Sequence, residues 1–278
     1  MNKKILSLLV AAGLVFGATQ AYAVNITIAD NEVSGYGFSG GPTGVGLEDN
    51  ETEAGTISSQ VWDMEAFVVS GTTLYIVGGY NMQAGESGSG GSVVAGKLTP
   101  GDLFIKVGGS APGFNPIGAG SGDTTNIYGY NYAIDLTQPV GATGAFAAVY
   151  SVNAASVFNT VIYDQFGANP WKYASGGTQV ASTGISYSSG LSDATVNSNL
   201  GISVSGGSHN VLAIDLSFLS VAANTNVYFS YTMECGNDSL KGRYSGGFDQ
   251  VPDGGTSAVL IGLGLVAMVA VGYKRRQA

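Results

Sequence analysis

Few residues in this chain could serve nucleophilic catalysis, because it contains one cysteine, Cys235, and one histidine, His209. A single histidine excludes a multi-histidine metal centre and leaves Cys-His or Ser-His chemistry as the conventional options. Cys235 and His209, oriented by an acid such as Asp215, would make such a set, although no local pattern links the three. The alternative, which we favour, is that Cys235 is a small buried hydrophobic residue.

Two carboxylates two positions apart, Asp63 and Glu65, lie in the segment "SSQVWDMEAFVV", which is typical of a β-strand. Residues two apart point to the same face of a strand, with Cβ atoms about 6 to 7 Å apart. Such a pair is compatible with the two acids of a polysaccharide hydrolase. Adjacent acids on one face are more often a solvated outer surface, so we expect no enzyme here.

Calcium is the one cofactor that the acidic residues suggest, because this cation takes oxygen ligands from carboxylates, amides and carbonyls. The candidate ligands lie in "GLEDNETEAG" and are Glu48, Asp49, Asn50, Glu51 and Glu53. Their spacing is not that of an EF-hand. A second stretch, "CGND", could supply Asn237 and Asp238 to a cation or could form a tight turn, which its composition favours.

Aromatic residues could bind sugar rings if they lay on an exposed face. The chain has fifteen tyrosines in addition to Trp62 and Trp171, and the stretch "NPWKYASGG" is typical of a loop bearing an aromatic residue. Aromatic residues on strands are mostly core residues or cross-strand pairs. A glycan-binding module therefore stands as an alternative function.

The elements that must position these residues are β-strands, because alternation with a period of two recurs and amphipathic helices do not. We expect strands at residues 24–29, 56–70, 73–78, 102–108, 127–136, 144–152, 179–188, 202–205, 211–218 and 227–233. Residues 71–72 would turn the second strand into the third. The only helical candidate in the body is a short piece at 154–158. The prediction is an all-β fold, a single β-sandwich or jelly-roll-like domain over residues 24–250.

The amino terminus has the pattern of a secretory signal peptide over residues 1–23. Two lysines precede an apolar run of about twelve residues, and the small residues Ala21 and Ala23 bracket Tyr22 as at a cleavage site. The run is too short for a membrane span, which needs about twenty residues. We therefore expect export through the Sec translocon and cleavage by signal peptidase after Ala23.

The carboxy terminus has the pattern of a transmembrane helix. Residues 256–273 carry no charge, and a helix of that length rises about 27 Å, close to the hydrocarbon thickness. The basic tail at 274–278, with Lys274, Arg275 and Arg276, predicts a cytoplasmic end. The alternative is a buried core helix, which would normally show polar residues at helical spacing.

The charge of the chain argues against a nucleic-acid partner. The formal net charge is −9 for the whole chain, and residues 24–250 hold five basic and eighteen acidic residues, a net charge of −13. Such a field repels nucleic acid and anionic lipid. Solubility of an exported, lysine-poor protein is the simpler reason for the acidity.

The last residues resemble a PEP-CTERM sorting signal of the VPD variant. The resemblance rests on a short motif, an apolar helix and a basic cluster in that order, and the motif residues are Val251, Pro252, Asp253, Gly254 and Gly255. It implies that an exosortase, a membrane-embedded cysteine protease-transpeptidase of Gram-negative bacteria, removes the tail near this motif. The inner-membrane anchor would then be transient.

Stretches in the body resemble an ectodomain of exported PEP-CTERM proteins. They are "WDMEAF", "GDLFIKV", "YNYAIDL", "HNVLAIDLSFL" and "TMECGNDSLKG". The last includes Glu234, Cys235, Gly236, Asn237 and Asp238, whose role the resemblance leaves open. The resemblance implies an exported β-rich domain with no assigned activity, and it transfers no catalytic residue.

These observations together predict a non-enzymatic protein of the cell surface or extracellular matrix. Its role would be structural or adhesive in an exopolysaccharide or biofilm matrix. A calcium-dependent or glycan-binding module is the first alternative, and a polysaccharide-active hydrolase is the second.

Overall fold

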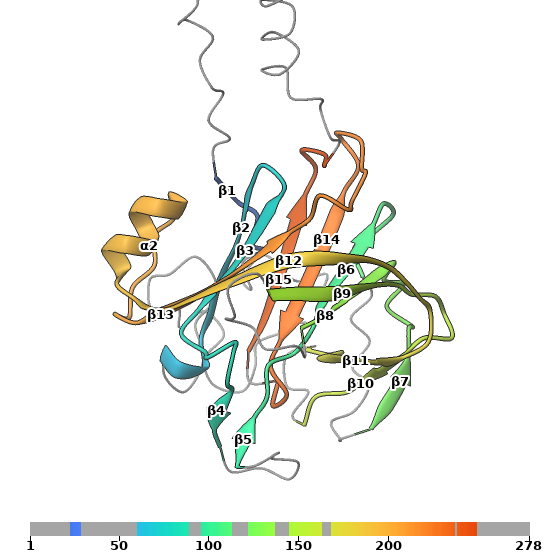
Figure 1. Ribbon diagram of the computed structural model, residues 1–278, viewed down its shortest axis with the longest axis horizontal. Helices are drawn as coiled ribbons and strands as arrows, with labels where there is room; N and C mark the ends of the chain where they lie inside the picture. Colours follow the sequence, from blue (N-terminus) through green and yellow to red (C-terminus); the bar gives the residue numbers. More distant parts are fainter. Residues whose placement is uncertain are drawn as a thin grey trace, which may run out of the picture. The chain divides into compact units, whose positions relative to one another are not determined.

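Antiparallel strands make up most of the structure, a computed structural model that describes residues 23–28, 60–88, 96–112, 122–136, 145–162, 168–236 and 238–248 (Figure 1). The main sheet has ten strands in the order β1-β2-β3-β13-β12-β9-β8-β6-β14-β15. In that order they are β1 (Val24–Asn25), β2 (Met64–Ser70), β3 (Thr73–Gly78), β13 (His209–Asp215), β12 (Thr178–Leu191), β9 (Ala145–Ser151), β8 (Tyr132–Asp135), β6 (Leu103–Val107), β14 (Val227–Thr232) and β15 (Ser239–Tyr244).

The main sheet curls until its two ends meet at the residues that follow β1. Ile26 donates its N–H to the carbonyl of Phe67 in β2 at 2.9 Å, and Ile28 donates to Lys241 in β15, also at 2.9 Å. Gly242 in β15 is needed for this approach, because a Cβ added there would lie 2.8 Å from the Phe67 ring. Residues 24–28 therefore join the first and last strands of the sheet order.

The curled sheet encloses the main hydrophobic core. Alternate residues of each strand point inward, for example Phe67 and Val69 in β2, and Phe229 and Tyr231 in β14. The rings of Phe67 and Phe229 lie 6.0 Å apart across the core, so opposite parts of the sheet order pack against each other. Figure 1 shows β9 and β12 running across the direction of β14 and β15, as expected of a strongly curled sheet.

Smaller elements cover parts of the outer face. A three-stranded sheet of β11 (Lys172–Ser175), β10 (Val157–Asn159) and β7 (Asp123–Thr125) adds a cluster of buried aromatic rings, which contains Phe104, Tyr128, Tyr130 and Phe158. Strands β4 (Glu86–Ser87) and β5 (Lys97–Leu98) form a hairpin, and η2 (Gln60–Trp62) precedes β2.

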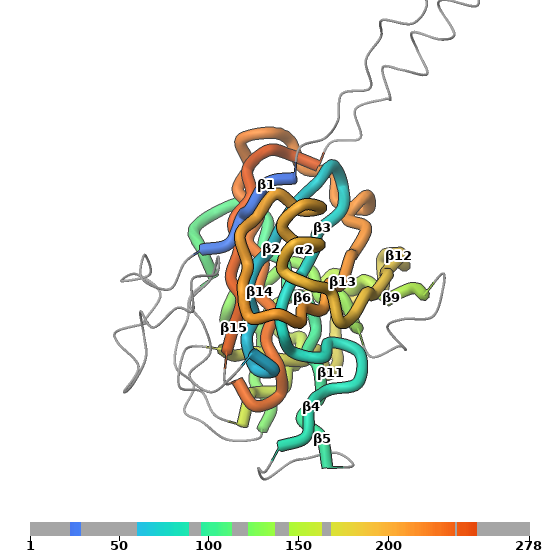
Figure 2. The backbone as a smooth tube through the Cα atoms, turned by 90° about the vertical axis from the view of Figure 1, so that its left-hand side faces the viewer, coloured from blue at the N-terminus to red at the C-terminus, as the bar shows by residue number. Residues whose placement is uncertain are grey.

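The one α-helix of the described residues, α2 (Asp193–Leu200), packs on the outer face of β2 and β3 (Figure 2). Its buried residues, Val196 and Leu200, lie four positions apart and contact a separate apolar cluster that includes Val68 and Val77. Ser192 caps the helix by accepting the N–H of Thr195 at 3.3 Å. The helix therefore depends on one short apolar contact and on its polar end contacts.

The prediction of an all-β domain is confirmed in its coarser form: the domain is mostly β, a curled antiparallel sheet with one α-helix among the described residues. The β2–β3 hairpin forms around residues 71–72, and β3 has the predicted bounds. Residues 154–158 are not helical but form a turn that leads into β10, and residues 202–205 form no strand. Of the predicted strand at 56–70, residues 56–59 lie outside the described residues, residues 60–62 form η2, and the strand begins at Met64.

The predicted signal peptide, apolar span, sorting motif and basic tail lie outside the described residues. Within the described ranges, no helix has both the length and the hydropathy needed to cross a bilayer. The described residues belong to one compact unit, Ala23–Phe248.

Candidate functional site

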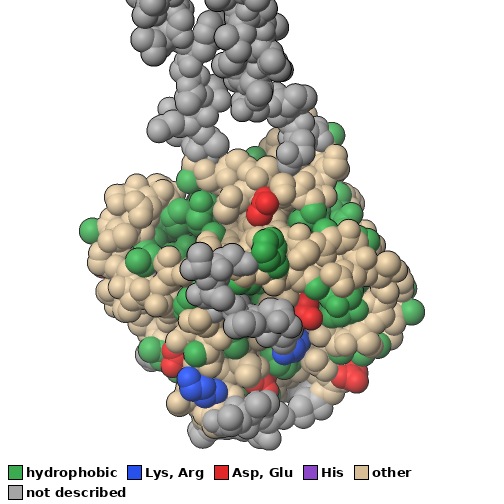
Figure 3. Space-filling view, in the orientation of Figure 1, with side chains coloured by type: hydrophobic (Ala, Val, Ile, Leu, Met, Phe, Trp, Pro, Cys, Tyr) green, Lys and Arg blue, Asp and Glu red, His purple; other side chains and the backbone are tan. Residues whose placement is uncertain are grey.

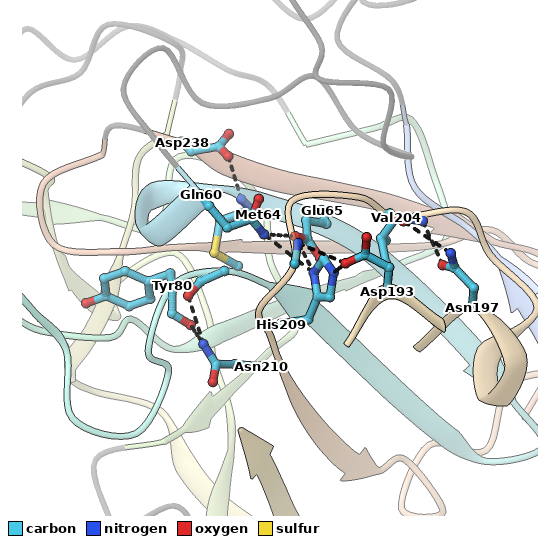
Figure 4. A network of polar contacts seen from close by, with 12 residues as sticks. Gln60, Met64, Glu65, Tyr80, Asp193, Asn197, Val204, His209, Asn210 and Asp238 are labelled. Carbon is cyan, nitrogen blue, oxygen red and sulfur yellow. Dashed lines mark hydrogen bonds and ion pairs between the residues drawn. The ribbon is translucent and has the colours of Figure 1, made fainter. Parts of the chain in front are cut away.

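The single histidine is buried against a glutamate from another strand. His209 begins β13, and Glu65 lies in β2 where one extra residue faces β3 between Met64 and Ala66. A bulge of this kind re-aims a side chain. The Nδ1 atom of His209 lies 2.7 and 2.8 Å from the two carboxylate oxygens of Glu65, and both side chains are 0% exposed (Figure 4).

The other side of the imidazole ring faces the helix. Asp193, the first residue of α2, places Oδ1 2.8 Å from Nε2 of His209, and its side chain is 42% exposed. The same oxygen accepts the N–H of Gly207 at 2.8 Å. Gln60 donates its side-chain amide to Glu65. Figure 4 shows the imidazole between the two carboxylates, so a charged cluster links η2, β2, β13 and α2.

The two carboxylates favour the charged form of the imidazole. Burial alone would lower the pKa of His209, but hydrogen bonds and charge from Glu65 and Asp193 outweigh burial and raise it. The hydrogen bond from His209 lowers the pKa of Asp193. In the charged form both nitrogens donate, and the ring then has no lone pair with which to accept a proton. This arrangement fastens α2 to the sheet.

We expect the imidazole to titrate above its ordinary pKa of 6.5. Because the folded state raises this pKa, the stabilisation is complete below about 6.5 and is lost as the pH rises through the folded value. His209 is the only histidine, so the imidazole signals in an NMR titration belong to it without further assignment. Asp193→Asn should shift the midpoint downward. A midpoint at or below 6.5 in the unsubstituted protein would contradict this assignment.

The structure does not bring Cys235, His209 and Asp215 together. Asp215 ends the strand that His209 begins, about 20 Å away along β13. Its carboxylate accepts the N–H and the hydroxyl of Ser217 at 2.9 and 2.8 Å. Cys235 is packed in the main core, as the simpler reading expected.

Asp63 and Glu65 do not lie on a solvated face, because both are 0% exposed. Glu65 is committed to His209. Asp63 precedes β2, and its carbonyl accepts the N–H of Gly79 at 2.9 Å. A Cβ added at Gly79 would lie 1.7 Å from the carbonyl oxygen of Gln60, so the chain there must pass without a side chain.

The residues Glu234, Cys235, Gly236 and Asp238 form the turn between β14 and β15, and Asn237 lies outside the described residues. Glu234 accepts the N–H and the hydroxyl of Thr99, each at 2.9 Å. Asp238 accepts the N–H of Met64 at 2.7 Å. The described members of this motif therefore fasten the turn to β2 and to the chain around Thr99.

The two tryptophans do not form an exposed aromatic platform. Trp62 is half-buried, with its ring 6.1 Å from that of Tyr80. Trp171 is 9% exposed. Among the described residues, the one strongly exposed aromatic side chain is Phe146 in β9, at 61%, which the sequence did not single out.

The predicted calcium ligands, Glu48, Asp49, Asn50, Glu51 and Glu53, lie outside the described residues, as do the residues of the sorting motif. Within the described ranges, no group of three or more His, Cys, Asp or Glu side chains is placed to hold a metal ion.

Sequence reasoning missed two acids with structural importance. Asp193 is the second carboxylate of the His209 cluster, and the helix signal around it, Ser192 before and Gly201 after, could have been read as a pair of caps. Asp102 precedes β6 and is 1% exposed. Its two oxygens accept the N–H groups of Leu136 and Tyr173, each at 2.8 Å.

Comparisons with protein-family models, with curated proteins and with solved structures return no match to this chain.

Proposed function

We propose that this chain is an exported, non-enzymatic protein with a structural or adhesive role at the cell surface or in an extracellular polysaccharide matrix. The two ends of the sequence support export: the pattern of a signal peptide over residues 1–23, and the order of motif, apolar stretch and basic tail over residues 251–278. The partners would be the Sec translocon, signal peptidase and an exosortase, with a transient stay in the inner membrane.

One observation carries the non-enzymatic part of the proposal. The only histidine has both ring nitrogens bound by carboxylates of the same chain, at 2.7 and 2.8 Å. The only cysteine is packed in the core. The only histidine and the only cysteine of the chain are thus used to hold the fold.

The surface is consistent with contact to an uncharged polymer. Figure 3 shows one face on which charged side chains are few and hydrophobic side chains gather in small, separate patches. Aggregation through a large apolar face is disfavoured by such a surface.

We propose that this domain is a sandwich-like variant in which one curled sheet supplies both facing layers, supported by the Phe67–Phe229 contact across the core.

The sorting proposal is tested by replacing Pro252 and Asp253 with alanine in the native host. We expect the double variant to remain full-length in the inner membrane, since the motif would no longer be recognised. Cell fractionation with intact-mass measurement reports both location and length. The unsubstituted protein should begin at Val24 and end near 251–255.

A matched control replaces Asp249 and Gln250, just before the motif, with alanine. It also removes one acid and should be processed normally. Release of the Pro252→Ala, Asp253→Ala variant to the surface at its mature mass would overturn the sorting proposal.

A further inference from the structure

A hollow of about 260 Å³ lies on the outer face of the main sheet, where β9, β12, β13 and β3 run side by side. Its lining includes Phe146, Gly184, Asp215, Thr73 and Ser186. We propose that it binds one neutral hexopyranose unit of a polysaccharide. This inference rests on the proposed adhesive role and names its ligand class.

The strand register fixes the geometry of the hollow. Phe146 is paired with Gly184, and Asp215 is paired with Thr73. Ile185 is paired with Ile214, so Gly184 lies beside Asp215. The row across the four strands is therefore Phe146, Gly184, Asp215 and Thr73. Neighbouring strands lie about 4.8 Å apart, which separates Phe146 from Asp215 by about 10 Å.

These side chains face outward because their neighbours face the core. Ala147 follows Phe146, and Ile185 and Ile214 adjoin Gly184 and Asp215; all three neighbours are buried in the main core. Residues alternate between the two faces of a strand. The phenylalanine ring and the carboxylate thus stand on one face, on either side of a residue without a side chain.

The floor between them is open. A Cβ added at Gly184 would meet no atom within 4 Å. Ser186 and Ala213 are also small, and they line the hollow together with Ala145 and Ile185. The gap between the ring and the carboxylate can therefore receive a flat ligand of about the size of one six-membered ring.

The chemistry of the walls selects a ligand with an apolar face and a polar rim. An exposed aromatic ring provides apolar area at small cost in side-chain entropy, and small-ligand sites combine such surfaces with a few placed polar groups. Asp215 accepts from Ser217, yet a carboxylate has about four acceptor sites, so it can also accept ligand hydroxyls. Thr73 and Ser186 add hydroxyl groups. A pyranose ring has this combination of C–H faces and hydroxyl edge.

The charge of the site excludes acidic sugars. Asp215 borders the hollow, and residues 24–250 hold five basic and eighteen acidic residues, a net charge of −13. A uronate would be repelled by this field. The ligand is therefore a neutral hexose residue.

Saturation-transfer difference NMR on the protein purified from its host tests the proposal with the methyl glycosides of glucose, galactose and mannose. We expect transfer from the protein to the ring C–H protons of at least one of them, and no competition by polygalacturonate. Phe146→Ala should reduce the affinity at least tenfold. Gly184→Val, which suits a strand and fills the floor, should do the same.

Ile127→Ala is the matched control, since it removes another exposed hydrophobic side chain outside the hollow. It should bind as the unsubstituted protein does. Absence of transfer to every neutral glycoside, or equal binding by the Phe146→Ala and Gly184→Val variants, would overturn the site. If no glycoside binds but fractionation shows that the chain is processed normally, the sorting proposal stands and only the sugar site is rejected.

Discussion

Glu65→Ala is expected to lower the free energy of unfolding by about 3 to 5 kcal/mol, the range observed when one partner of a buried ion pair is removed. The substitution deprives the buried His209 of its nearer carboxylate and leaves the Gln60 amide without its acceptor. Urea unfolding at pH 6, where the imidazole is charged, measures the loss.

Glu65→Gln is the matched control because it keeps the volume and one acceptor for Nδ1 of His209. It should lose less stability than Glu65→Ala and should lower the pKa of His209. Asp193→Asn, at a partly exposed position, should have a smaller effect than either. A loss below about 1 kcal/mol in Glu65→Ala would mean that the cluster contributes no more than an exposed ion pair.

Asp102→Ala is expected to cost about 2 to 4 kcal/mol, because two backbone N–H groups lose their acceptor and each unpaired buried donor costs about 1 to 3 kcal/mol. The carboxylate joins the residue after β8 to the edge strand β11, through Leu136 and Tyr173. Thermal and urea unfolding should both report the loss. Asp102→Asn retains one acceptor and should lose less.

The same carboxylate has a predictable pH profile. Burial, with a smaller effect from Asp135, raises the pKa of Asp102 from 3.8 to about 7 against the lowering effect of its two backbone hydrogen bonds. Because the fold favours the protonated form, this group makes the free energy of unfolding decline as the pH rises from about 4 to about 7. Asp102→Asn should lack that decline, and an identical profile in both proteins would contradict it.

The longer strands could be predicted from the apolar residues of the sequence, whereas the helix could not be predicted from them and is indicated only by its caps, Ser192 and Gly201. Residues 73–78 are rich in β-branched and aromatic residues and form β3 as expected. Helix α2 has only Val196 and Leu200 as buried residues, which is too few to give a helical period. Short strands such as β4 and β7 are held by their partners and carry no alternation long enough to detect.

Individual residues of the polar cluster could be picked out from the sequence, but their contact with one another could not be predicted. His209 and Glu65 both drew attention, yet they lie 144 residues apart and no local pattern joins them. Their meeting depends on a bulge in β2 and on the placement of β13 beside β3. The same is true of Phe146, which is paired with Gly184 on the neighbouring strand β12.

The closure of the sheet by residues 24–28 has a kinetic consequence. Thr27 bridges to Gly242, so more than two hundred residues must be present before the ring of strands can be completed. Contacts so distant in sequence form slowly, and synthesis of the intervening chain alone takes on the order of 10 to 40 s. Until β15 is available, the first segment lacks one of its two neighbouring strands. A chain built in this way cannot close its sheet before β15 has been synthesised, which is compatible with the proposed export through a narrow pore before folding.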